Sequence, residues 1–461
     1  MNLVWFRSDL RVRDNLALQA AQDLGNTIAL YIATPLQWQA HDDAPIKLDF
    51  WRRNLAELEQ SLASLNIPLI FCQVDNYTAV PQLISDAINT WGVTSLHFNA
   101  EYALNESRRD HQVIKLVEEM DVKTLVQHDQ VLLQPGSVLN NSGEPFKVYT
   151  PFAKKCRIMM MLPGRRKGRS NPSGLKKKPV RLPAQLKLHD IDWPKANTDW
   201  EKMWPAGEAV AQKRLKQFCS KAIKAYKQHR DFPAIAGTST LSPWLNAGVI
   251  SIRDCWRQAS MEESGEGAQT WKNELLWREF YKHILFHYPH VSMQKAFRRN
   301  LDAIPWRHDK KEFKRWCDGQ TGIPIIDAAM RQLKETGWMH NRLRMITAMF
   351  LTKHLLIDWR WGEKWFMTHL IDGDFSANNG GWQWSASTGT DAVPYFRIFN
   401  PVTQSRRFDQ EARFIRQYIP ELADLDNKSI HDPGLHKPES YPKPMIDLKF
   451  GRMRALETFK K

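Results

Sequence analysis

Long hydrophobic runs are absent from this sequence of 461 residues. No segment comes near the roughly 20 apolar residues that a membrane-spanning helix needs. The opening MNLVWFRSDLRVRD carries a charge by residue 7 and lacks the apolar run of a secretory signal. The sequence therefore predicts a cytoplasmic protein that does not bind membranes.

Cysteine is also scarce. The five cysteines, at positions 72, 156, 219, 255 and 317, lie far apart and form no C-x-x-C pair. This spacing argues against a disulfide framework and against a zinc site, and it suits a reducing compartment. The first apolar run is not followed by G-x-G-x-x-G, so we expect no NAD-type binding loop.

Charge of one sign dominates only part of the chain. Residues 1–150 carry 11 Lys or Arg and 18 Asp or Glu, a net charge of −7, whereas residues 151–461 carry 54 and 32, a net charge of +22. A basic surplus confined to one part predicts a polyanion partner for that part, and nucleic acid is the first candidate. We expect a monomer without an obligate protein partner.

Short apolar runs alternate with helix-like stretches over the first 130 residues. This alternation is typical of a parallel, doubly wound α/β sheet. The expected strands lie at 3–6, 28–34, 68–74, 95–100 and 123–127, and the expected helices at 15–22, 47–65, 78–90 and 105–120.

From about residue 205 the strand signals fade, and periodic segments predict an all-helical domain. These segments are 208–226, 268–288, 309–317, 323–336, 338–358, 360–370 and 410–418. We therefore predict an α/β domain at 1–130, a linker at 131–204 and an all-α domain at 205–461. Within the linker, 164–181 holds eight basic residues, three Gly and two Pro. It is interpreted as a solvated linker rather than as a phosphate contact.

Two stretches of the helical domain suggest chemistry beyond packing. In GTSTLS (237–242), small hydroxyl residues precede a helix start. This is either an ordinary N-cap or an anion site suited to a diphosphate. In WKNELLWREFYKH, Trp271, Glu274, Arg278 and Tyr281 share one helical stripe. The stripe is either a solvated face with an i,i+4 ion pair or the wall of a cavity.

Two further stretches join polar and aromatic residues. In 338–359, Asn341, Arg344 and Met345 share a helix face, whereas Arg342 points elsewhere, toward a possible phosphate. In IDGDFSANNGGWQW no His lies at ligand spacing, so we expect Asp372 to pair with Arg344 rather than to bind a metal.

Two tryptophans end that last stretch, one residue apart. If a helix follows the Gly pair, positions i and i+2 point to nearly opposite sides. One of Trp382 and Trp384 would then face the protein and the other a cavity; the alternative is that both belong to the core. Ten of the nineteen Trp fall between 271 and 384.

These stretches, in this order after an α/β domain, resemble the photolyase–cryptochrome family. The likeness covers nearly the whole chain and rests on LVWFRSDLRVRDNLAL, YKQHRDFP, the TSxLS turn, NELLWREFY, WMHNRLRM and DGDFSANNGGWQWSASTGTD. Within the family the chain is similar to the class I branch that repairs cyclobutane pyrimidine dimers. Relatives that repair (6-4) photoproducts carry His where Asn341 and Met345 stand. The chain also lacks the long tail of many signalling cryptochromes.

The resemblance implies FAD, bent into a U within the helical domain. By motif match its phosphates would be held by Tyr226, Thr238, Ser239, Thr240, Leu241 and Ser242, with Trp271 nearby. The isoalloxazine side would be lined by Asn341, Arg344, Asp372, Gly373 and Asp374, and Asn378 would face N5. The family usually carries Arg or another long polar residue where Thr240 stands. Phosphate contact is therefore weaker here if that side chain matters, and unchanged if only the backbone does.

The resemblance also implies a lyase that uses light to repair UV-damaged DNA. Excited, reduced FAD would give an electron to a dimer that has left the base stack. Glu274 would hydrogen-bond the dimer, and Trp277 and Trp384 would stack on it. The strand and the lesion would further contact Arg230, Arg278, Tyr281, Asn341, Arg342, Met345 and Gln404.

A tryptophan chain is implied as well. Trp306, Trp359 and Trp382 match the residues that carry electrons from solvent to oxidised flavin in the family. Trp306 lies in PWRHDKK, and this segment is charged enough that we expect the outer end of the chain at the surface.

The α/β domain resembles the antenna-binding domain of the family. His41, Asn105 and Glu106 match positions that hold methenyltetrahydrofolate in close relatives. Those relatives place a Lys near Met293, whereas here the nearest is Lys295. A deazaflavin or an empty antenna site stays open.

Two other functions fit parts of this pattern. A blue-light sensor that binds DNA or a partner without repair would share the fold and the flavin. A basic flavoprotein that binds nucleic acid without using light would leave the tryptophan chain unexplained.

Overall fold

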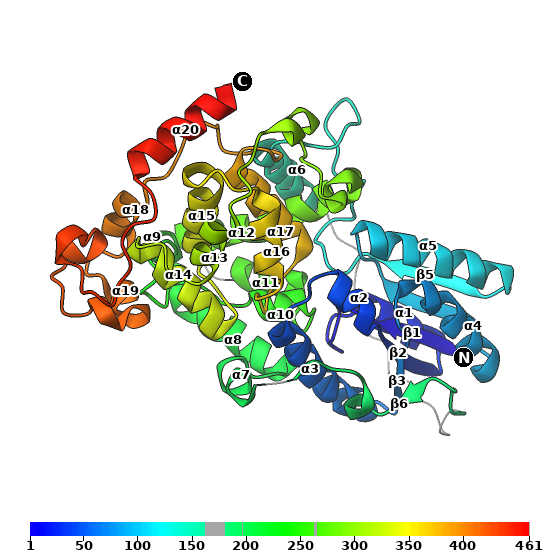
Figure 1. Cartoon of the computed structure of the whole chain (residues 1–461). Coiled ribbons are helices and arrows are strands. Elements are labelled where there is room, and N and C mark those ends of the chain that lie inside the picture. Colours follow the sequence, from blue (N-terminus) through cyan, green and yellow to red (C-terminus); the bar gives the residue numbers. More distant parts are fainter. Residues whose placement is uncertain (162–179, 196, 262–264, 461) are drawn as a thin grey trace. The chain divides into compact units, whose positions relative to one another are not determined.

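The computed structural model describes residues 1–161, 180–195, 197–261 and 265–460 (Figure 1). The chain divides into two compact units. Unit 1 comprises Met1–Cys219, Ser239–Ser264 and Lys272–Pro289, and unit 2 comprises Ser220–Thr238, Gly265–Trp271 and His290–Lys461. The units interleave along the chain, and the boundaries predicted from the sequence stay predictions.

A six-stranded sheet with the order β5-β4-β1-β2-β3-β6 lies at the centre of the α/β part of unit 1 (Figure 1). The strands are β1 Asn2–Phe6, β2 Thr27–Ala33, β3 Leu69–Gln73, β4 Ser95–Asn99, β5 Lys123–Gln127 and β6 Gln185–Leu186. The first five are parallel, and β6 pairs antiparallel with β3. This confirms the predicted parallel sheet. The edge strand β6 is only two residues long, too short to show a period in the sequence.

Strands β1, β2 and β4 are buried at every residue. Parallel strands are covered on both faces, so continuous apolar runs such as LVWF are their natural sequence. Helix α1 begins after Asn15, whose side chain accepts a hydrogen bond from Leu18 N at 3.1 Å. The other helices of the α/β part are α2 Pro35–Ala40, α3 Pro45–Ala63, α4 Val80–Trp91 and α5 Leu104–Glu119, and α1 itself is Leu16–Leu24.

The rest of the described chain is almost entirely helical, as the sequence predicts. Its helices are α6 Tyr149–Met161, α7 Thr198–Met203, α8 Glu208–Ser220, α9 Tyr226–His229, α10 Ser242–Asn246, α11 Ile252–Met261, α12 Glu266–His287, α13 Lys310–Cys317, α14 Pro324–Thr336, α15 Asn341–Met349, α16 Trp359–Met367, α17 Phe375–Ala386, α18 Pro401–Phe408, α19 Arg413–Tyr418 and α20 Leu448–Lys460. Within residues 1–161, 180–195, 197–261 and 265–460, no helix has the length and apolar character to span a lipid bilayer.

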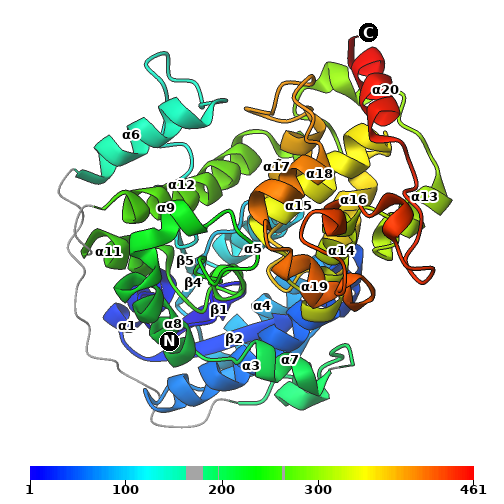
Figure 2. The same cartoon turned by 90° about the vertical axis from the view of Figure 1, so that its left-hand side faces the viewer.

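Two features of the helical part differ from the sequence prediction. The helix expected at 338–358 is interrupted, because α15 gives way to a π-helical turn at Phe350–His354. Helix α6 lies in the predicted linker and runs beside α12 (Figure 2). Of the basic stretch 164–181, residues 164–179 lie outside the described residues.

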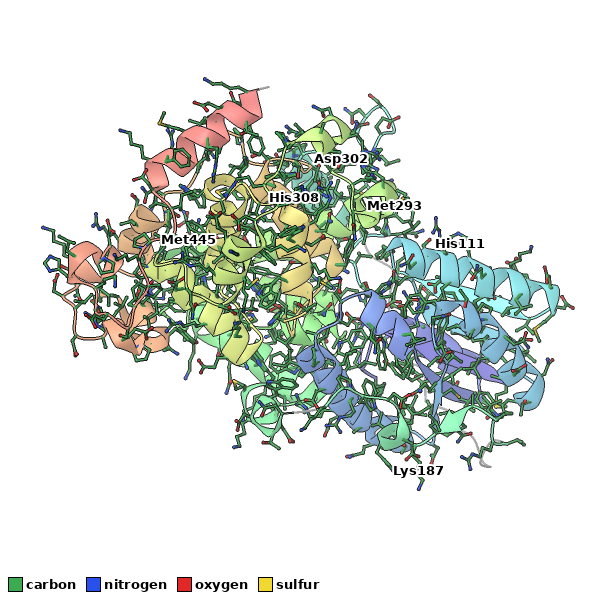
Figure 3. All side chains as sticks on the ribbon, in the orientation of Figure 1. His111, Lys187, Met293, Asp302, His308 and Met445 are labelled. Atoms are coloured by element: carbon green, nitrogen blue, oxygen red, sulfur yellow. The ribbon has the colours of Figure 1, made fainter. Side chains whose placement is uncertain are left out.

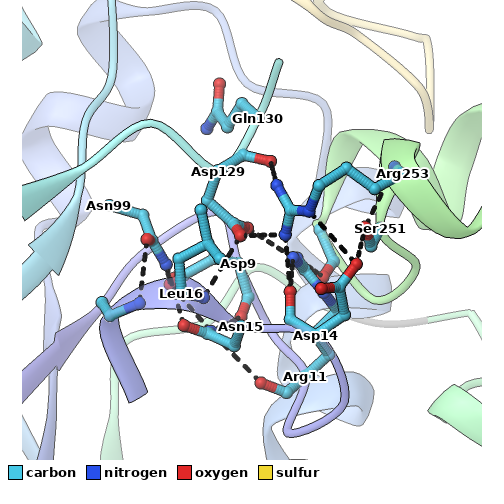
Figure 4. Close-up of polar contacts among 12 residues, drawn as sticks. Asp9, Arg11, Asp14, Asn15, Leu16, Asn99, Asp129, Gln130, Ser251 and Arg253 are labelled. Atoms are coloured by element: carbon cyan, nitrogen blue, oxygen red, sulfur yellow. Dashed lines mark hydrogen bonds and ion pairs between the residues drawn. The ribbon is translucent and has the colours of Figure 1, made fainter. Parts of the chain in front are cut away.

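A buried group of charges joins three segments of unit 1 (Figure 4). The Asp129 carboxylate, 1% exposed, pairs with Arg11 from the loop after β1 and with Arg253 of α11. The Arg253 guanidinium also donates to Asp14 Oδ2 at 3.2 Å and to Asp14 O at 2.6 Å. Burial raises the pKa of Asp129, but the two guanidinium groups outweigh it and hold the pKa below its usual value. The carboxylate is therefore ionised at neutral pH and pairs with the buried Arg11 and with the half-buried Arg253, whose second anionic partner is Asp14.

Gly248 allows two backbone segments of unit 1, around Ser8 and around Gly248, to approach closely beside these charges. Its φ is +66°, and a Cβ there would lie 2.2 Å from Ser8 O. Leu10 N donates to Ala247 O at 3.1 Å, and Arg11 Nη1 donates to Gly248 O at 2.9 Å. A side chain would separate these two loops, so only Gly fits.

Replacing Asp129 with Asn should destabilise the protein strongly, by about 3–5 kcal/mol, because the buried Arg11 guanidinium loses its counterion and Arg253 keeps only Asp14. The free energy of unfolding in urea measures the loss. The exposed Asp23 of α1 supplies the control variant Asp23→Asn, which should change stability by less than about 0.5 kcal/mol.

The loss should also depend on pH in one direction. The folded pKa of Asp129 is lowered, so its stabilising contribution is complete above the unfolded pKa near 4 and disappears as the pH falls through the folded pKa. The difference between wild type and Asp129→Asn should therefore shrink below about pH 4. A difference under 1 kcal/mol at pH 7 would contradict the role given to this carboxylate.

Candidate active site

Two of the predicted site residues of unit 2, Arg344 and Asp372, form an ion pair. Arg344 Nη2 lies 3.0 Å from Asp372 Oδ1 and 2.8 Å from Oδ2, and Arg344 Nε donates to Met339 O at 2.8 Å. The Asp372 side chain is nearly fully buried. The pairing predicted from the sequence is confirmed.

Helix α15, which carries Arg344, is capped by His340. Its Nδ1 accepts from Arg342 N at 3.1 Å, and an acceptor nitrogen requires a neutral ring. Burial, together with the cations Arg342 and Arg344, lowers the pKa of His340 to about 4, against the opposing effect of Asp231. The cap is therefore intact at neutral pH. Asn341 and Met345 are exposed and half-buried, respectively, on the same helix.

Helix α17 begins at Phe375, because Asp374 is its N-cap and accepts from Ala377 N at 3.2 Å. Asn378 lies in the first turn, and its amide nitrogen donates to Glu363 O at 3.0 Å. The expectation that the Gly pair precedes this helix is wrong, since Gly380 and Gly381 lie inside it. The strong cap at Asp374 outweighs the cost of two interior glycines.

The two tryptophans of α17 differ in exposure, as predicted. Trp382 is 2% exposed, and its ring packs edge-on against Phe366 at 4.9 Å and Trp316 at 6.0 Å. A Cβ at Gly362 would lie 2.1 Å from Trp382 Cη2, so α16 carries Gly where this ring crosses it. Trp384 is only half-buried.

Trp359 and Trp306 complete the predicted tryptophan chain, and both are buried. Trp359 is fully buried, and Trp306 is 8% exposed. The expectation that Trp306 lies at the surface is wrong. Asp302 and His308, labelled in Figure 3, flank it in the sequence, but the charges of PWRHDKK do not keep the ring in solvent.

The cover over Trp306 comes from the C-terminal helix α20. The Phe459 ring meets the Trp306 ring edge-on at 5.8 Å. The same Phe459 ring lies 3.5 Å from Nζ of the buried Lys353. Burial lowers the pKa of Lys353 to about 7. Trp306 Nε1 is buried and has no hydrogen-bond partner among the described residues.

Asp231 brings together two of the predicted DNA-contacting arginines of unit 2. Arg342 Nη2 lies 2.8 Å from Asp231 Oδ1, and Arg230 Nε lies 3.7 Å from it. The Arg342 guanidinium also lies over the Phe408 ring of α18, the helix that carries Gln404. The predicted cofactor residues Tyr226 and Trp271 of this unit are buried, whereas Thr238 is half-buried.

The hydroxyl turn 239–242 of unit 1 contains a residue pair that sequence reasoning missed. Arg214 Nε, from α8, lies 2.8 Å from Thr240 Oγ1 and 3.3 Å from Ser239 O. Thr240 has a φ of +48°. Arg214 therefore places a long cationic side chain beside Thr240. No local sequence pattern links the two positions, which are 26 residues apart. Leu241 of the turn is buried, and Ser242 is the first residue of α10.

The predicted stripe of α12 also lies in unit 1, apart from Trp271. Trp277 stacks on Tyr149 and lies 5.8 Å from the Tyr281 ring. Arg278 Nη1 donates to Gln130 O at 2.6 Å. Glu274 is half-buried on the same helix.

The three residues predicted to hold an antenna lie together in unit 1. Asn105 Nδ2 is 3.0 Å from His41 Nε2, and His41 Nδ1 is 3.4 Å from Glu106 Oε1. Tyr77, which the sequence did not single out, donates to Glu106 Oε1 at 3.3 Å. Burial raises the pKa of Glu106, against the effect of His41. Glu106 Oε2 is buried and has no hydrogen-bond partner among the described residues.

The described residues contain no group of His, Cys, Asp and Glu that could hold a metal ion. The five cysteines all lie among the described residues, are buried and form no disulfide.

Comparisons with known proteins cover the whole chain. Residues 2–169 match the DNA photolyase family model, and residues 271–461 match the FAD binding domain of DNA photolyase. The chain is 45% identical to a deoxyribodipyrimidine photo-lyase of Vibrio cholerae over 100% of this chain and 99% of that protein. It is 41% identical to that of Escherichia coli, over 99% and 98%.

Solved structures agree with these matches. A class III photolyase from Agrobacterium tumefaciens has a TM-score of 0.86 at 36% identity, covering 100% of this chain and 97% of that one. A cryptochrome from Synechocystis has a TM-score of 0.88 at 27% identity, covering 99% and 98%. With an FAD-binding domain and a DNA photolyase domain in one chain, and full-length relatives at 41 to 45% identity, the protein belongs to the DNA photolyase family.

Proposed function

We propose that this protein repairs cyclobutane pyrimidine dimers in DNA by a light-driven electron transfer, as a cytoplasmic monomer. The observation that carries the proposal is its 45% identity, over both full lengths, to a protein named deoxyribodipyrimidine photo-lyase. Asn341 and Met345 on α15 support dimer repair over (6-4) repair, because relatives with the latter activity carry His there.

The residues fit FAD as the cofactor. The Arg344–Asp372 pair offers a donor and an acceptor side by side, which suits the N–H and carbonyl groups along one edge of a flavin ring. The hydroxyl turn beside Arg214 offers a cation and hydroxyl donors, which suit a diphosphate. We assign FAD binding to Tyr226, Thr238, Ser239, Thr240, Leu241, Ser242, Trp271, Asn341, Arg344, Asp372, Gly373, Asp374 and Asn378.

Bound reduced FAD supplies the electron that opens the cyclobutane ring when it absorbs light. The protein binds and orients the lesion. Glu274 donates a hydrogen bond to it, or a proton, while Trp277 and Trp384 stack on the two bases. Trp382, Trp359 and Trp306 return electrons to oxidised cofactor.

The DNA strand is held by basic and polar side chains. In unit 2 these are Arg230, Arg342 and Gln404, and in unit 1 they are Arg278 and Tyr281. Asp231 holds Arg230 and Arg342 close together before DNA binds. The two arginines can then contact two phosphates with a smaller loss of side-chain entropy on binding.

We further propose methenyltetrahydrofolate as the antenna, held by His41, Asn105 and Glu106. The support is the buried Glu106 Oε2, which has no hydrogen-bond partner among the described residues. Buried polar atoms in proteins normally form hydrogen bonds. A pterin N–H would satisfy this oxygen. Relatives place a Lys near the position of Met293, which is exposed here and labelled in Figure 3, and the nearest Lys in this chain is Lys295.

Repair itself is the first test. An oligonucleotide with one thymine dimer, mixed with the reduced protein, should regain intact thymines under blue light and not in darkness. Reversed-phase chromatography of the strand measures the conversion. Retained FAD and bound DNA without repair would favour the light-sensor function instead.

Replacing Glu274 with Gln should lower the repair yield per absorbed photon severalfold while FAD stays bound, because the hydrogen bond to the reacting dimer weakens. The flavin absorbance and the repair yield are measured on the same sample. Glu266→Gln, an exposed position on the same helix, is the control and should repair normally. An unchanged yield in Glu274→Gln would remove the assigned role.

Replacing Trp306 with Phe should abolish light-driven reduction of oxidised FAD by an external thiol, because Phe is too hard to oxidise to pass the electron on. Repair by chemically pre-reduced protein should persist. Trp361→Phe changes a tryptophan of α16 that packs on Phe313 and should leave photoreduction intact. Photoreduction that survives in Trp306→Phe would show that electrons take another path.

A further inference from the structure

Two aromatic rings of unit 1 lie face to face on the proposed substrate surface. The Tyr149 and Trp277 rings have centroids 3.7 Å apart and planes only 6° from parallel. Aromatic pairs prefer offset or edge-on geometry, because face-to-face stacking opposes their quadrupoles. This geometry is therefore imposed by contacts around the rings.

Asn273, one turn before Trp277 on α12, supplies those contacts. Tyr149 Oη donates to Asn273 O at 2.8 Å, and Arg157 Nη2 donates to Asn273 Oδ1 at 2.5 Å. Asn273 of α12 thus contacts α6 at two points, Tyr149 in its first turn and Arg157 two turns later. Helix α6 is fixed in register on α12 at this point.

Apolar packing fixes the same register. Phe152, in the first turn of α6, is 1% exposed and lies 5.2 Å from Phe280 and 5.0 Å from the His283 ring. Three consecutive turns of α12 therefore contact α6, through Asn273, Phe280 and His283. Figure 2 shows the two helices side by side.

The surface around the stack suits a strand of DNA. Tyr149 and Trp277 are both half-buried, and Lys147 and Lys154, on either side of Tyr149 in the sequence, are exposed. Basic side chains next to aromatic rings are typical of surfaces that bind unpaired bases.

We propose that Tyr149 is a positioning residue for dimer recognition, which backs one face of Trp277 so that the opposite face is held ready for the extruded lesion. This inference rests on the proposed function, because it takes from it the role of Trp277. A ring stacked on one side cannot rotate away, so less freedom is lost when a base stacks on the other. Tyr149 thereby favours lesion binding without touching the lesion.

The test compares dissociation constants in darkness, where the dimer is not consumed. The probes are an oligonucleotide with one thymine dimer and the same oligonucleotide undamaged, bound to the FAD-loaded protein. Tyr149→Leu should weaken binding to the damaged probe about tenfold, comparable to the loss of one stacked partner. Binding to the undamaged probe should change by less than about twofold.

Two variants separate this role from a structural one. Tyr149→Phe loses the hydrogen bond to Asn273 O but keeps the ring, and the packing of Phe152 still holds α6 in register, so damage selectivity should stay within about twofold of wild type. Phe146→Leu removes a neighbouring ring that packs on Phe152 and should leave selectivity unchanged. Equal loss of both probes in Tyr149→Leu would overturn the inference.

A double-mutant cycle tests whether Tyr149 acts through Trp277. Trp277→Leu should lose damage selectivity, and adding Tyr149→Leu should cost nothing more. If the losses of the two single variants add in the double variant, the inference about Tyr149 is wrong but the role of Trp277 stands. The same holds if Tyr149→Leu binds the damaged probe like wild type while Trp277→Leu does not. Wild-type selectivity in Trp277→Leu would overturn the role of Trp277 in the proposed function, and this inference with it.

Discussion

One buried carboxylate joins the α/β and helical parts of unit 1. Asp129 follows the last parallel strand, and its two guanidinium partners come from the loop after β1 and from α11. Removing any one of the three leaves an unbalanced buried charge, which costs more than most core substitutions. The end of the edge strand β5, the loop after β1 and helix α11 are therefore fixed in one arrangement. The segment SDLRVRDN is held in place by the ion pairs of Arg11 and Asp14 as well as by packing.

The fold was largely predictable, because its signals are local. Strands β1, β2 and β3 are mainly apolar runs of five to seven residues, and β4 and β5 carry shorter apolar groups within SLHFN and KTLVQ. The two-residue β6 and helix α6 were not visible. Helix α6 buries only Phe152, Ala153 and Cys156, so its pattern is weak, and its position depends on distant residues of α12.

Contacts in the site were predictable where the chemistry of a residue requires a particular partner. They were not predictable where two residues meet only because the fold brings them together. The Arg344–Asp372 pair was expected because a buried carboxylate without metal ligands needs a cation. Arg214 was not, because α8 meets Thr240 only after folding. The exposure of Trp306 was misjudged for the same reason, since Phe459 lies 153 residues further along the chain.

The covered Trp306 has a consequence for how fast the cofactor can be recharged. In the proposed chain, an electron hole on this ring meets no acceptor for the Nε1 proton among the described residues, and the residue is only 8% exposed to a reductant in solvent. The ring is covered by the last turn of α20, and helix ends open more readily than helix interiors. If the proposed tryptophan chain operates, opening of that last turn of α20 is what gives a reductant access to the ring.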